Sequence, residues 1–136
     1  MPKNALGLGA NHHLLAHQAA GTGLKAMEKL GTYDKFHADL IAVLLQQMKD
    51  TREPGGSMLD NTFVLFGCSN SKTHVNRNYP LMLVGGSNLG IKQGNFHDLS
   101  TSDARMSDLL LTMLNHLDVP VPSFSDSTRI IEEIVA

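Results

Sequence analysis

Apolar residues recur at helical spacing in two long stretches of this chain. The first, about residues 33–49, carries a broad apolar stripe with a period of about 3.6 residues, which predicts an amphipathic helix. Thr32 lies where an N-cap is expected, and the Glu-Pro-Gly-Gly segment at 53–56 ends the pattern. The second stretch, residues 106–117, predicts another helix, which Pro120 terminates.

Glycine residues divide the region before the first of these helices. A Gly-Thr-Gly segment at 21–23 separates a short stretch at 13–20 from another at 24–30. Gly31 follows the second stretch, and glycine is the residue most often found just beyond a helix end. We therefore expect two short helices here, with the long helix starting anew after Gly31.

Two compact apolar runs, Asn61–Gly67 and Pro80–Val84, are typical of strands that are buried on both faces. Such strands alternating with helices predict an α/β fold with a mainly parallel sheet and flanking helices. Two strands alone make a weakly stable sheet. We therefore expect residues 1–136 to form a single domain that is part of a larger one or that needs a partner chain to cover its sheet edges.

Composition narrows the classes of function. The 136 residues are 42% hydrophobic and 18% charged, as in a soluble globular domain. The 11 lysines and arginines are scattered and the net charge is −2, which argues against a nucleic-acid partner. The longest apolar run, residues 41–45, is too short to span a bilayer, and the first residues lack the apolar core of a signal peptide. These features leave the cellular compartment undetermined.

Three histidines have the spacing of a metal site. His13 and His17 are four residues apart and share one face if their segment is helical, and His74 follows the first expected strand. Three imidazoles are a known ligand set for zinc, with a fourth position left for water or substrate. The alternative is a surface helix with unrelated imidazoles, because a His-x-x-x-His pair is frequent by chance and the glutamate of the zinc-protease signature is absent.

Two further side chains invite a chemical interpretation. His37 lies on the apolar stripe of the long helix, which favours a place in the core or a supporting hydrogen bond beside a metal rather than direct ligation. Cys68, the single cysteine, follows the first strand, where a nucleophile could lie. Nothing near it in sequence lowers a thiol pKa, so we expect a small buried thiol instead.

Beyond these patterns, the segment His12–Gln18 resembles the His-x-x-Ser-His-His motif that names a bacterial family of largely uncharacterised proteins. Ala16 and Gln18 depart from the motif, at its serine and its last histidine. The resemblance extends over most of the chain. Its other parts are the long helix, Leu59-Asp60-Asn61-Thr62 with the strand to Gly67, the stretch from His74 to Gly86, and Phe124–Thr128. Typical members are considerably longer, so the chain is expected to correspond to their C-terminal part.

That family is in turn similar, more distantly, to the alkaline phosphatase and sulfatase superfamily. The resemblance implies a partial alkaline-phosphatase-like α/β layer. It also implies one retained metal site at His13, His17 and His74, and one lost site, because Ser69 and Asn70 stand where the superfamily has Asp and His. Ser69 and Asn70, like His37, are then expected to support the retained site rather than to bind its metal.

The function implied by this resemblance is hydrolysis of phosphate or sulfate esters with a divalent metal, expected to be zinc. Arg77 and Lys72 would neutralise the anionic ester. The region that carries the superfamily's nucleophile lies upstream in the longer proteins. The alternative is therefore a non-catalytic remnant or binding module of a larger protein or complex. Family members often carry export signals, and none is seen here.

Overall fold

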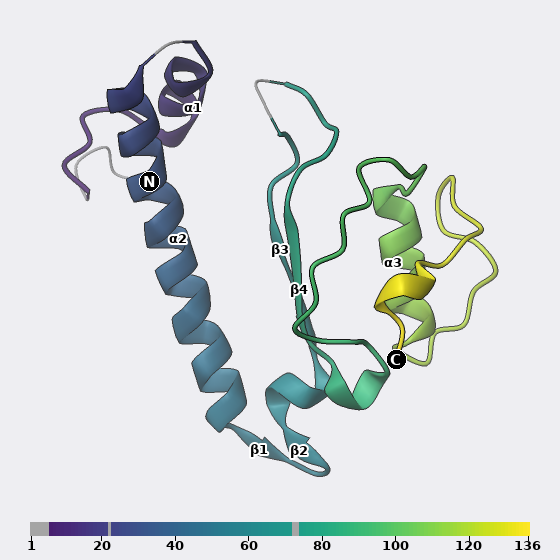
Figure 1. Ribbon diagram of the computed structural model, residues 1–136. Helices are drawn as coiled ribbons and strands as arrows, with labels where there is room; N and C mark the ends of the chain where they lie inside the picture. Colours follow the sequence, from purple (N-terminus) through teal and green to yellow (C-terminus); the bar gives the residue numbers. More distant parts are fainter. Residues whose placement is uncertain (1–5, 22, 72–73) are drawn as a thin grey trace. The chain divides into compact units, whose positions relative to one another are not determined.

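The computed structural model describes residues 6–21, 23–71 and 74–136 (Figure 1). The chain divides into two compact units. The first comprises the residues up to Gln47 together with Ser69–Tyr79, and the second comprises Met48–Cys68 and Pro80–Ala136. All three of the histidines with metal-site spacing belong to the first unit.

Helix α1 (His12–Gly21) confirms the helix expected before the Gly-Thr-Gly segment. Asn11 caps it, because its side-chain oxygen accepts a hydrogen bond of 2.8 Å from the backbone amide of Leu14. Leu15 is the buried residue of α1, at 1% exposure, and Tyr33 of the following helix is equally enclosed at 3%. These two side chains provide the core of the first unit.

Helix α2 (Leu24–Asp50) is continuous, so the prediction of a break at Gly31 is wrong. A single glycine inside a helix costs only about 1 kcal/mol relative to alanine, which a helix of 27 residues tolerates. Thr32 is not an N-cap. Its hydroxyl donates to the Glu28 carbonyl at 3.0 Å, inside the helix. One turn further on, Lys35 and Asp39 form an exposed ion pair with a 2.7 Å contact.

The sheets of the second unit overturn the predicted fold class. Strand β3 (Phe63–Gly67) pairs antiparallel with β4 (Leu81–Gly85), and a two-residue turn joins β1 (Arg52–Glu53) to β2 (Gly56–Ser57), also antiparallel. The described part of the chain thus has two short antiparallel sheets and three α-helices, not a mainly parallel α/β layer of the alkaline-phosphatase kind.

The connection between the strands gives the physical reason. Parallel neighbours need a crossover, usually a helix, whereas antiparallel strands can return directly. No helix lies in the described residues between β3 and β4, and the chain returns to pair Gly67 with Leu81. The prediction that both strands are buried on both faces is also wrong. Most β3 residues are half-buried, and Leu81 and Met82 of β4 are exposed.

A polar cluster fixes the turn that leads into β3. Asp60 accepts hydrogen bonds from the Ser57 amide at 2.8 Å, the Ser57 hydroxyl at 2.7 Å and the Ser87 hydroxyl at 2.6 Å. The side-chain oxygen of Asn61 accepts a hydrogen bond from the side-chain amide of Asn88 at 2.8 Å. The Leu-Asp-Asn-Thr segment, part of the resemblance described above, therefore has a structural role in tying the turn to the residues that follow β4.

The Asp60 carboxylate makes the second unit sensitive to acid. Hydrogen bonds from Ser87 and then Ser57 lower its pKa from 3.8 to about 2. Because the folded-state pKa is depressed, this stabilisation is present above pH 3.8 and is lost as the pH falls toward 2. We expect Asp60→Asn to show less loss of stability than the wild type between pH 4 and pH 2 in urea unfolding followed by circular dichroism. Asp118→Asn, in an exposed turn, is the control, and equal slopes for the wild type and Asp60→Asn would contradict the assignment.

Helix α3 (Met106–Asn115) confirms the second predicted helix and holds the C-terminal tail. The Thr112 hydroxyl accepts the amide of Ile131 at 2.8 Å, and Ile91 bridges to Val135. The tail ends in a short 3-10 turn, Glu132–Ile134. Among the described helices, none is long and apolar enough to cross a membrane.

Candidate functional site

Three histidine rings lie next to one another in the first unit. His13 and His17 are one turn apart on α1, and their ring centres are 4.6 Å apart. His74 comes from the 69–79 segment, and its ring centre lies 5.2 Å from that of His17. His17 is thus in ring contact with both of the other candidate ligands.

These separations can be compared with those of metal ligands. Two imidazoles bound to one tetrahedral zinc by bonds of about 2.0–2.1 Å have ring centres roughly 5 Å apart. Both ring-centre distances in the structure are close to that value. Within the described residues, however, no group of three or more His, Cys, Asp or Glu side chains is already arranged to hold a metal ion. All three rings are exposed, so the imidazoles are adjacent but not preassembled around one point.

The backbone of His74 adopts an uncommon conformation. Its φ of 56° is in the left-handed region, which a non-glycine residue rarely occupies. The turn is closed by a 2.8 Å hydrogen bond from the Ser71 amide to the Val75 carbonyl. Strained backbone of this kind is concentrated at functional sites, where surrounding contacts hold a side chain in a required position. Three other described non-glycine residues also have left-handed φ values, so the conformation of His74 supports the ring contacts but does not by itself mark a site.

The other residues expected at the site lie mostly outside the histidine contacts. Asn70 donates to the Ser69 hydroxyl at 3.5 Å, and neither residue has a hydrogen bond to the three histidines. Arg77 is exposed in the same segment as His74, and it has no ion pair with any residue that the structure places. Lys72 lies outside the described residues. Their roles at a metal site stay predictions.

His37 lies in a second group of rings, between α1 and α2. It is half-buried and is in ring contact with His12, Tyr33 and Phe36. His12 also approaches Asp34, with 3.7 Å between Nε2 and Oδ1. Sequence reasoning found only part of this group: the helical spacing shows that His12 points away from His13 and His17, but not that it faces α2.

The position of Cys68 contradicts the prediction of a buried thiol. It is exposed rather than buried, and its thiol lies 3.9 Å from the Pro80 carbonyl. Position 68 directly follows the last residue of β3, at the open end of a two-stranded sheet. Because this position lies just past the end of the strand, the sheet does not enclose the thiol.

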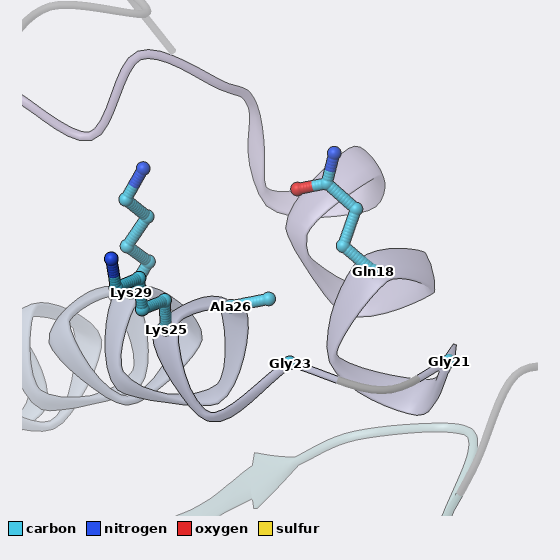
Figure 2. Close-up of a pocket in the computed structure, with 6 residues that line it drawn as sticks. All are labelled: Gln18, Gly21, Gly23, Lys25, Ala26 and Lys29. Carbon is cyan, nitrogen blue, oxygen red and sulfur yellow. The ribbon is translucent and has the colours of Figure 1, made fainter.

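A cavity between α1 and the start of α2 was not predicted. Its volume is about 370 Å³. Figure 2 shows the side chains of Lys25 and Lys29 leaving α2, that of Gln18 leaving α1, and that of Ala26 pointing from α2 toward α1. The sequence signal was present, because lysines four residues apart lie on one face of a helix that starts after a Gly-Thr-Gly segment.

Comparisons with protein-family models, curated proteins and solved structures found no match to the chain. The resemblance of residues 12–18 and 59–62 to the His-x-x-Ser-His-His family therefore stays a prediction. The geometry of the two helices and of the 69–79 segment is the basis on which a function can be proposed.

Proposed function

We propose that this chain is a metal-binding domain in which His13, His17 and His74 hold one divalent ion. The observation that carries the proposal is the position of the His17 ring, 4.6 Å from His13 and 5.2 Å from His74. Neutral imidazole suits several transition metals, and a small tetrahedral set of nitrogen ligands favours zinc.

The chain's own residues contribute the geometry. The α-helical spacing of His13 and His17 presents two imidazoles from one rigid element, while the turn closed by Ser71 and Val75 presents the third. Because all three side chains are exposed, rotation about side-chain bonds is enough to bring their nitrogens toward one ion. Zinc held by three histidines keeps a fourth position open and activates water near neutral pH.

Elemental analysis of zinc-loaded, dialysed protein tests the proposal. We expect about one zinc ion per chain in the wild type and loss of most of it in His74→Ala, because two imidazoles hold the ion far less tightly than three. His97→Gln is the matched control, since His97 belongs to the second unit and its loss should leave the zinc content unchanged. Zinc retention in His74→Ala equal to that of the wild type would overturn the assignment.

Hydrolysis of anionic esters is the second candidate, and Arg77 is the observation that favours it. This guanidinium lies three residues after His74 and carries a charge that no described carboxylate neutralises. The described residues supply no nucleophile in contact with the three histidines, so hydrolysis would depend on activated water, a partner chain or a missing upstream region. Turnover of an aryl phosphate or aryl sulfate by the zinc-loaded protein, abolished in Arg77→Gln, is the expected result. Without turnover, the binding function alone stands.

A further inference from the structure

The cavity between α1 and α2 has the chemistry of an anion site. It is lined by Gln18, Gly21, Gly23, Lys25, Ala26 and Lys29. None of these described residues is acidic, although the chain as a whole has a net charge of −2. Two lysines and a glutamine therefore border the cavity, and the positive charges of the lysines favour anions over cations there.

The two lysines lack counter-ions in the described structure. The side chains of Lys25 and Lys29 form no ion pair with any placed residue, whereas Lys35 on the same helix is paired with Asp39 at 2.7 Å. Their spacing of four residues places two like charges side by side, which disfavours the helix. An anion bound between them would relieve that repulsion.

The lining also indicates the size and type of the anion. Lysine binds phosphate as a point charge, and two lysines balance the two negative charges of a phosphate monoester. The amide of Gln18 offers both a donor and an acceptor. Gly21, Gly23 and Ala26 have little or no side chain, and the resulting 370 Å³ leaves room for a group attached to the phosphate.

We propose that Gln18, Lys25 and Lys29 form a binding site for a doubly charged oxyanion of the phosphate class. The site shares no residue with the proposed three-histidine metal site. Binding of the oxyanion does not require a metal ion at those histidines. Its failure and the failure of the metal proposal are therefore distinguishable experimentally.

The test is a nitrogen-15 NMR titration of the metal-free, full-length chain at low ionic strength. Inorganic phosphate and phenyl phosphate are the two probes, and sodium chloride at equal ionic strength corrects for general salt effects. We expect saturable shifts at residues 18–29 with both probes, and roughly ten-fold weaker binding in the Lys25→Gln/Lys29→Gln double variant. Tighter binding of phenyl phosphate would identify a monoester as the preferred ligand, and equal binding would identify phosphate itself.

Lys35→Gln is the matched control, because it removes a lysine from the same helix outside the cavity. Its affinity should equal that of the wild type. Shifts that do not saturate with either probe, or equal affinities of the double variant and the wild type in folded proteins, would overturn the proposal. Circular dichroism of each variant establishes that α2 is intact, so a lost signal is not mistaken for unfolding.

Discussion

Replacing Asp108 by alanine is expected to lower the free energy of unfolding of the second unit by about 3 kcal/mol, because three hydrogen bonds to a buried carboxylate would be lost. The Asp108 side chain is 3% exposed. It accepts the Ser127 hydroxyl at 2.5 Å, the Arg105 amide at 2.8 Å and the Arg129 guanidinium at 2.8 Å. Alanine would leave these donors without their acceptor and would release the tail from α3.

The same contacts determine the pKa of Asp108. Burial raises its pKa, but the hydrogen bonds from Ser127, the Arg105 amide and Arg129 together outweigh burial, so the net pKa lies below 3.8. The depressed folded-state pKa means that this carboxylate stabilises the fold above pH 3.8 and less as the pH falls through its lowered value. The difference between Asp108→Asn and wild type should therefore be largest at neutral pH and shrink in acid.

Urea unfolding of Asp108→Ala and Asp126→Ala compares the stability that a buried carboxylate contributes with that of an exposed one. Asp126 also bonds to this region, through Ser107 at 2.6 Å, but its side chain is 66% exposed. The exposed ion pair of Asp126 with Arg105 contributes about 0–1 kcal/mol, so the loss of stability in Asp126→Ala should be small. If both variants lose the same stability, the buried carboxylate is not what holds the tail.

Local sequence patterns predicted the helices better than the sheets. The glycines at 21–23 delimit one predicted helix, and the apolar stripe before Pro120 gives another. Gly31 led to the wrong prediction of a helix end, because the neighbouring residues do not show whether the helix continues past it. The direction of β3 and β4 could not be predicted, since short apolar runs are the same in parallel and antiparallel pairs.

The candidate site was predictable only where one helix carries its residues. The spacing of His13 and His17 fixes their common face, and the structure adds that the His74 ring lies next to His17. The left-handed backbone of His74 depends on its turn, and the cavity depends on how α1 approaches α2. Neither the backbone conformation nor the approach of the two helices has a signature in the residue types. Only the four-residue spacing of Lys25 and Lys29 was visible in the sequence.

His17 is expected to be the most sensitive position for metal binding. It is the ring in contact with both partners, so its removal separates the remaining two imidazoles. Loss even of residues that only support a ligand costs 10–100-fold in metal affinity, and we expect His17→Ala to lose more than about 100-fold. His12→Gln, on the same helix but facing Tyr33, is the control for removing an imidazole, and competition with a zinc-binding dye provides the measurement.

X-ray absorption spectroscopy at the zinc edge tests the three-histidine site most directly. In the wild type loaded with one equivalent of zinc, we expect three imidazole nitrogens at about 2.0–2.1 Å and a fourth light-atom ligand. In His74→Ala, any zinc that remains should show one imidazole fewer. A wild-type protein that does not retain zinc, or a spectrum with fewer than three imidazoles, would contradict the assignment of His13, His17 and His74 as a shared metal site.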